Sequence, residues 1–201
     1  MSDVILDLGC GRRWTKWIPE VESDPNDYIV YCVDTIFNTS RTAKYDFEQL
    51  YSENDNVKLI GANIFDFLQN YKRNDVQTIY SDRTFEHIPY DKLHFLFYLL
   101  KEVCRPDAKM IFTVPNFKTV FDDISRYQHK ITQGGQITKD LIDFHTEVFN
   151  EKYDPHLSIW TPDLAYYYVE LENYWKINSI EDNYKIDNRD WYMKITATRN
   201  M

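Results

Sequence analysis

Residues 4–11 read VILDLGCG, an apolar run of strand length that leads directly into a glycine turn. Gly9 and Gly11 lack a Cβ atom, so the backbone can take positive φ angles there and turn sharply against a bound molecule. In α/β sheets, a turn of this kind at the carboxyl end of the first strand is where ligands bind. The run therefore predicts a site for a nucleotide-type cofactor.

The residues after this turn narrow the class of cofactor. A dinucleotide fingerprint has the form G-x-G-x-x-G, and Trp14 stands where its third glycine would be. A phosphate-binding P-loop ends in G-K-[ST], and no such ending follows. The turn thus matches neither the dinucleotide fingerprint nor the P-loop.

Length and composition limit the classes of protein. At 201 residues the chain predicts a single domain, 1–201, and the net charge of -9 argues against a surface that follows nucleic-acid phosphates. Cys10, Cys32 and Cys104 are dispersed, so neither a disulfide framework nor a metal site is predicted. No signal peptide or long apolar run is present, and we expect a soluble cytoplasmic protein with no membrane partner.

Strand-like and helix-like patterns alternate along the first half of the chain. A helical face is formed by residues spaced at i, i+3, i+4 and i+7 from Leu93 to Cys104, and Pro106 should stop that helix. This alternation predicts right-handed βαβ crossovers and a mostly parallel sheet. The expected strands after the first are residues 28–34, 57–60, 76–82 and 109–115.

The last third of the chain has a different pattern. Residues 174–181 and 191–198 read as two strands joined by the polar segment 182–190, which predicts an antiparallel hairpin. The expected fold is a Rossmann-like, seven-stranded, mostly parallel sheet with helices on both faces and this hairpin at its end. Residues 117–161 do not follow the strand and helix rhythm, and we expect them to form a partly helical lid or substrate-side insertion.

Four motifs occur in the order of one known family. The run ending in LGCG resembles motif I of the class I S-adenosylmethionine (SAM) dependent methyltransferases, in its L-G-C-G branch. Residues 81–89, SDRTFEHIP, resemble the L-E-H-I segment of the Methyltransf_11 group. Residues 99–116 resemble the turn and fifth strand of that group, and residues 156–162 resemble the start of its last large helix.

The resemblance implies SAM as the cofactor and assigns roles to particular side chains. Asp34, 23 residues after Gly11, is expected to accept hydrogen bonds from the ribose hydroxyls, and its alternative role is to cap the next helix. Asn63 is expected to read the adenine edge, with helix capping as an alternative role and Asp66 as the alternative residue. The full set of expected cofactor-binding residues is Asp7, Gly9, Cys10, Gly11, Asp34, Thr35, Asn63, Ile64, Ser81, Asp82 and Arg83.

The implied reaction is direct transfer of the methyl group to an O, N or C nucleophile of a small molecule or saccharide. A base is needed only if the acceptor must lose a proton before it attacks. The candidates are His145, Glu147 and His156 in the segment 117–161, with His87 and Asp82 on the scaffold, and Glu86 is considered beside His87. The alternative is a non-catalytic Rossmann-like module that binds SAM or a partner. A second subunit is the alternative to residues 117–161 as the cover of the pocket, which leaves a homodimer open.

Overall fold

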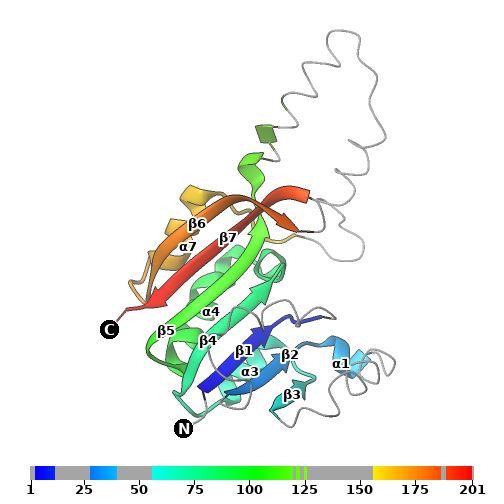
Figure 1. Cartoon of the computed structure of the whole chain (residues 1–201), viewed down its shortest axis with the longest axis vertical. Coiled ribbons are helices and arrows are strands. Elements are labelled where there is room, and N and C mark those ends of the chain that lie inside the picture. Colours follow the sequence, from blue (N-terminus) through cyan, green and yellow to red (C-terminus); the bar gives the residue numbers. More distant parts are fainter. Residues whose placement is uncertain are drawn as a thin grey trace.

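The computed structural model describes residues 3–11, 28–39, 56–119, 121–122, 125, 156–186 and 189–200. Its centre is a seven-stranded sheet with the order β3-β2-β1-β4-β5-β7-β6, as Figure 1 shows. β7 runs antiparallel to both of its neighbours, and the pairs among β1 to β5 are parallel. The strands are β1 (Asp3–Leu8), β2 (Tyr28–Val33), β3 (Val57–Ile60), β4 (Val76–Asp82), β5 (Cys104–Pro115), β6 (Trp175–Ile186) and β7 (Arg189–Arg199).

The central strand β1 is apolar almost throughout because both of its faces are buried. Val4, Leu6 and Leu8 point into the larger of two apolar clusters, and Ile5 points into the smaller one on the opposite face. The predicted seven-stranded, mostly parallel sheet with a C-terminal antiparallel hairpin is therefore confirmed.

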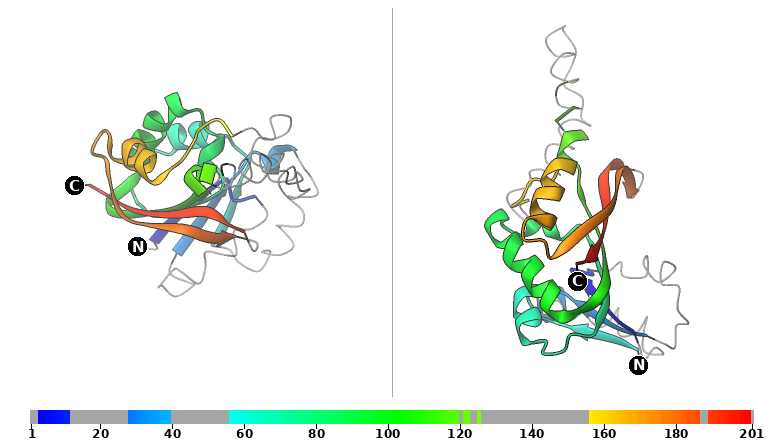
Figure 2. Two further views of the ribbon diagram at one scale, coloured as in Figure 1. Left: turned by 90° about the horizontal axis from the view of Figure 1, so that it is seen from above. Right: turned by 90° about the vertical axis from the view of Figure 1, so that its left-hand side faces the viewer.

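Three of the described helices cover the face with the larger cluster. These are α3 (Ile64–Asn70), α4 (Tyr90–Val103) and α7 (Pro162–Glu170), which lie together on one side of the sheet in both views of Figure 2. The predicted helical face is confirmed, since Leu93, Leu96 and Leu100 of α4 are fully buried. The predicted stop was wrong, because the helix ends at Val103 and Pro106 lies within β5. The short helix α1 (Ile36–Thr39) follows β2.

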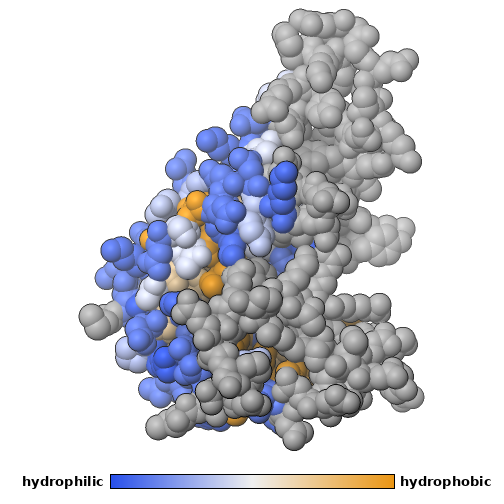
Figure 3. Space-filling view, viewed as in Figure 1, coloured by the Kyte–Doolittle hydropathy of each residue, from blue (hydrophilic) through white to orange (hydrophobic). Residues whose placement is uncertain are grey.

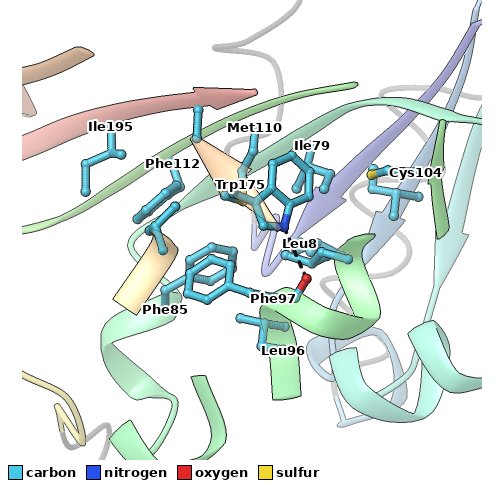
Figure 4. Packing of buried hydrophobic residues seen from close by; sticks show 14 of the residues in the cluster. Leu8, Ile79, Phe85, Leu96, Phe97, Cys104, Met110, Phe112, Trp175 and Ile195 are labelled. Carbon is cyan, nitrogen blue, oxygen red and sulfur yellow. Dashed lines mark hydrogen bonds between the residues drawn. The ribbon is translucent and has the colours of Figure 1, made fainter. Parts of the chain in front are cut away.

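Aromatic side chains fill much of this larger cluster. Trp160, Trp175, Phe85 and Phe112 are fully buried. The indole N–H of Trp175 donates to the backbone carbonyl of Phe97 over 3.1 Å, as Figure 4 shows, so the ring is buried without losing a hydrogen bond. A large part of the aromatic content of the chain therefore serves packing.

Three predicted strand boundaries were wrong by two or more residues. β5 starts at Cys104, five residues before the predicted start, because Asp107 takes a left-handed φ of 67° and the ladder continues across this irregularity. The hairpin strands extend to Ile186 and from Arg189, through most of the predicted polar connection. Register shifts around Tyr184 accommodate the polar residues of this connection. The surface over β6 and β7 is mostly hydrophilic in Figure 3, with a smaller hydrophobic strip.

The predicted lid at 117–161 is described only at its two ends. Phe117 and Trp160 are buried, and the N–H of Phe117 donates to the carbonyl of Trp160 over 2.9 Å. These ends are thus part of the core, and residues 126–155 lie outside the described residues. Within the described ranges, no helix is both long and apolar enough to cross a lipid bilayer.

Candidate functional site

The carboxyl ends of β1, β2, β3 and β4 converge on a pocket of about 440 Å³. This volume is in the range of small-molecule and cofactor sites. The pocket lies at the edge of the sheet where parallel α/β folds bind their ligands. It is lined by Gly9, Val33, Asp34, Thr35, Ala62, Asn63, Ile64, Phe65, Arg83, Thr84, His87 and Ile88.

The glycine turn after β1 forms one wall of this pocket. Gly9 has a φ of 69°, and a Cβ atom there would lie 2.1 Å from Oγ1 of Thr84. Gly11 also has a positive φ, of 51°, but a Cβ there would meet nothing within 4 Å. Gly9 is therefore required by both conformation and space, whereas Gly11 is required by conformation alone.

The carboxylate of Asp34 holds the turn in place. Its Oδ2 accepts from the N–H of Gly11 over 2.9 Å, and its Oδ1 accepts from the N–H of Ile36 over 2.8 Å. The second contact supports the start of α1, so the capping role considered for this residue is present in the structure. Asp34 also lines the pocket, next to Thr35.

Asn63 lies at the N-terminus of α3 and at the rim of the pocket. Its side-chain oxygen accepts from the N–H of Phe65 over 2.9 Å, so the alternative helix-capping role is confirmed. Asn63 and Ile64 both line the pocket. Asp66, the alternative residue for adenine recognition, lies in the first turn of α3 and is not part of the pocket lining.

Arg83 follows β4 in a left-handed conformation, with a φ of 53°. Its N–H donates to the carbonyl of Thr113 over 3.0 Å, and its Nε lies 3.5 Å from Oδ2 of Asp82. The hydroxyl of Thr113 donates to the other oxygen of Asp82 over 2.5 Å. These contacts hold a conformation that is unfavourable for a residue with a Cβ, and such residues concentrate at functional sites.

Some of the predicted cofactor residues lie behind the pocket wall. Ser81 is fully buried, and its hydroxyl donates to the carbonyl of Leu8 over 3.0 Å, which ties β4 to β1. Cys10 packs with Cys32 in the smaller apolar cluster, where that neighbouring thiol and burial raise its pKa. These residues, together with Asp7, Gly11 and Asp82, are not part of the lining.

Asp7 is the most strongly perturbed acid behind the wall. Its side chain is 3% exposed, and burial, followed by the charges of Asp82 and Asp34, raises the pKa of its carboxyl to about 8. Among the described residues its Oδ1 has no hydrogen-bond partner. A carboxyl in this environment holds its proton at neutral pH.

Two of the candidate bases lie close together at the pocket. His87, at the end of the 3-10 helix η3 (Phe85–His87), lines the pocket, and its ring centroid lies 5.0 Å from that of His156. The structure therefore brings these two predicted residues together. The candidates His145 and Glu147 lie outside the described residues, and Asp82 is not part of the pocket lining.

Sequence reasoning missed one polar residue of the site, Thr84, which lines the pocket and abuts Gly9. Thr84 belongs to the 81–89 motif, so its place there was the available signal. Glu86 of the same motif, which was considered beside His87, is buried and adjoins both histidines. The apolar lining residues Val33, Ala62, Phe65 and Ile88 carry no chemical signal in the sequence, because they resemble ordinary core residues.

Comparison with known proteins gives no match by sequence but many by structure. No family model and no curated protein matches the sequence. A possible exported protein from Bordetella parapertussis superposes with a TM-score of 0.64 at 9% identity, over 100% of this chain and 62% of its own. The cyclopropane synthase MmaA2 from Mycobacterium tuberculosis has a TM-score of 0.59 at 16% identity, over 90% of this chain and 57% of its own. The chain thus spans about three fifths of each of these proteins.

A third neighbour was solved with bound ligands. Geranyl diphosphate C-methyltransferase from Streptomyces coelicolor A3(2), in complex with Mg²⁺, geranyl diphosphate and S-adenosyl-L-homocysteine, superposes with a TM-score of 0.61 at 15% identity. The match covers 99% of this chain and 71% of that one. The chain therefore has the Rossmann-like fold that solved methyltransferases share.

Proposed function

We propose that this protein is a SAM-dependent methyltransferase that acts on an O, N or C nucleophile of a small molecule or saccharide. The observation that carries the proposal is the pocket at the carboxyl ends of β1 to β4, where the glycine turn, Asp34 and Asn63 face one cavity. The same fold in geranyl diphosphate C-methyltransferase, which was solved with S-adenosyl-L-homocysteine, supports it.

The lining residues fit the adenosine part of SAM. Each oxygen of a carboxylate can accept about two hydrogen bonds, and each oxygen of Asp34 accepts one from the backbone. Two further acceptor positions therefore remain for the two ribose hydroxyls. The backbone contacts fix the direction of the carboxylate before the ligand arrives, which lowers the entropic cost of binding.

The helix cap of Asn63 determines which of its side-chain atoms can contact the adenine edge. Because its side-chain oxygen accepts from Phe65, the amide nitrogen is the group left to donate. A ring nitrogen of adenine is an acceptor and suits this donor. Ile64 and Phe65 add apolar surface for the flat face of the base.

When bound, SAM supplies an electrophilic methyl group on a positively charged sulfur. The part left to the protein is to align the acceptor, exclude water and, for an acceptor that carries a proton, remove it. His87 lines the pocket and His156 contacts its ring, so both histidines are placed where a base could accept that proton. His145 remains a sequence prediction.

Calorimetric titration of the full chain with SAM and with S-adenosylhomocysteine tests the proposal. We expect both to bind, and we expect Asp34→Ala to weaken binding by at least roughly 100-fold, since two hydrogen bonds to a charged group are lost at about 1.5–3 kcal/mol each. The matched control is Glu172→Ala, because Glu172 is an exposed acid just before β6, at the far edge of the sheet. Its affinity should equal that of the wild type.

The proposal fails if the wild-type protein binds neither compound. Binding without methyl transfer to any acceptor, in a screen of hydroxylated small molecules and saccharides, would instead favour the alternative of a non-catalytic SAM-binding module. Loss of binding in Asp34→Ala counts only if its circular dichroism spectrum matches the wild type, because the carboxylate also supports the glycine turn.

A further inference from the structure

Glu86, His87 and His156 form a compact group of metal-ligating side chains, which we call the Glu-His-His cluster. One donor atom from each of the three residues lies within 4.8 Å of the others. Nε2 of His87 lies 4.0 Å from Oε1 of Glu86, and the two imidazole rings meet edge to face at 5.0 Å. The sequence shows no metal-binding spacing here, because His156 lies far along the chain from the other two.

Hydrogen bonds of the main chain hold the cluster together. The N–H groups of Leu157 and Ser158 both donate to the carbonyl of Glu86, over 2.7 and 3.0 Å. The hydroxyl of Ser158 donates to the carbonyl of Phe85 over 3.1 Å and accepts from the indole of Trp160 over 2.9 Å. The segment that carries His156 is thereby hydrogen-bonded to η3, so the three side chains converge before any ligand binds.

The donor set of the cluster suits a particular class of cation. Two imidazoles and one carboxylate are the ligands of mononuclear sites for Zn²⁺ and other divalent first-row metals, with open positions left for water or substrate. Glu86 is 1% exposed, and a buried carboxylate is costly unless positive charge or hydrogen bonds compensate it. A divalent cation bound by the three side chains is one group that can provide such compensation, alongside the contacts that Glu86 already makes.

The spacing of the cluster is compatible with such a cation after small movements. Donors bonded to one Zn²⁺ at about 2.0–2.2 Å lie about 3–3.5 Å apart. The observed limit of 4.8 Å is about 1.5 Å wider. Both histidines are half-buried. Rotations of their side chains can close this difference while the hydrogen bonds between the two backbone segments stay in place.

We propose that the Glu-His-His cluster binds a divalent first-row cation of the Zn²⁺ type and that an oxygen of the methyl acceptor completes its coordination. The second part rests on the proposed function, and it follows from position, since His87 and Ile88 line the pocket. A cation lowers the pKa of a hydroxyl group that it binds. The O–H bond then breaks at neutral pH, the electron pair stays on the oxygen, and the proton passes to water, since both histidines are then ligands of the cation and no longer serve as bases. That oxygen forms the new O–C bond as the bond between the methyl group and the sulfur of SAM breaks. The acceptor class is therefore an alcohol, phenol or hydroxy acid.

Titration of the metal-stripped full chain with Zn²⁺ alone tests the cation site without using activity. We expect about one Zn²⁺ per chain, and the visible absorption of Co²⁺ added in its place should report coordination by nitrogen and oxygen. His87→Ala and His156→Ala should each weaken Zn²⁺ binding by at least roughly tenfold. The matched control is His94→Ala, a half-buried histidine of α4 that lies outside the cluster and should leave the affinity unchanged.

Glu86→Gln provides a further variant, because it keeps the size of the buried side chain and removes its charge. The proposal is overturned if the wild-type protein does not bind Zn²⁺, or if the histidine variants bind it as tightly as the His94→Ala control. These outcomes are independent of the SAM titration. SAM binding without Zn²⁺ binding removes the cation site alone, whereas Zn²⁺ binding without SAM binding removes the proposed function and leaves the cation site.

Discussion

The two sides of the pocket are built in different ways. On the glycine-turn side, Gly9, Asp34 and Asn63 follow strands that are neighbours in the sheet, and the carboxylate of Asp34 reaches the turn directly. On the histidine side, His87 and His156 come from segments that lie about 70 positions apart in the chain and are joined by hydrogen bonds and ring contacts.

Because the two sides are built differently, substitutions on them should have different effects. On the glycine-turn side, the side chain of Thr84 lies so close to Gly9 that an added Cβ atom would collide with it. The histidine side depends on the hydrogen bonds that Leu157 and Ser158 make to η3. Weakening the contacts of this segment should therefore affect the histidine side without disturbing the rest of the pocket. Substitutions on each side can therefore test whether the two sides are independent.

Gly9→Ala should have the largest effect. The new methyl group would collide with Thr84, and the positive φ would be strained, so we expect the free energy of unfolding to fall by roughly 2–5 kcal/mol. SAM binding should weaken by roughly 100-fold, which is about 2.7 kcal/mol. Urea denaturation and calorimetry measure the two effects.

The matched control for this substitution is Gly11→Ala, where the space is open and only the strain of roughly 1–2 kcal/mol applies. Adding Thr84→Gly to Gly9→Ala removes the atoms with which the methyl group collides, so it should restore part of the lost stability. Equal losses in Gly9→Ala and Gly11→Ala would show that the contact with Thr84 does not matter.

Asp7→Asn should change the pH dependence of stability. The folded protein holds the proton of Asp7 up to a pKa of about 8, whereas the unfolded chain releases it near 3.8, so this carboxyl favours folding at low pH and opposes it increasingly up to about pH 8. The contribution is at most about 1.4 kcal/mol per pH unit. Between pH 5 and 7, this carboxyl should therefore lower the free energy of unfolding of the wild type by roughly 2–3 kcal/mol. Asp7→Asn should not show this decrease.

Urea denaturation at pH 5, 6, 7 and 8 measures this effect. The exposed residue Asp122 offers the control, and Asp122→Asn should keep the slope of the wild type. If the slopes of wild type and Asp7→Asn coincide, then the proton of Asp7 is not held by the folded state and the acid behind the glycine turn has no part in its stability.

Ser158→Ala should have the smallest effect and should act on the histidine side alone. It leaves the buried indole N–H of Trp160 without the hydroxyl that accepts from it, which costs roughly 1–2 kcal/mol of unfolding free energy. SAM affinity should stay at the wild-type value, because Ser158 does not line the pocket. Ser179→Ala, in an exposed position of β6, is the control for stability. A weakened SAM affinity in Ser158→Ala would show that the two sides are coupled.

Much of the fold follows from patterns that are local along the chain. The apolar run before Gly9, the helical spacing of α4 and the Thr161-Pro162 start of α7 all specify their elements within a few residues, and Thr161 does cap α7 through the N–H of Leu164. The strand ends at Cys104 and Ile186 were missed because bulges carry polar residues through a sheet without a pattern of alternation.

Local patterns were enough to name the glycine turn, Asp34, Asn63 and His87, since each residue follows a strand or lies in a motif that can be read in order. Folding in three dimensions separated the residues that face the pocket from those, such as Asp7 and Ser81, that lie behind it. It also brought His156 to Glu86 and His87, because hydrogen bonds between distant backbone segments depend on how the sheet and helices pack, and no spacing in a linear sequence encodes them.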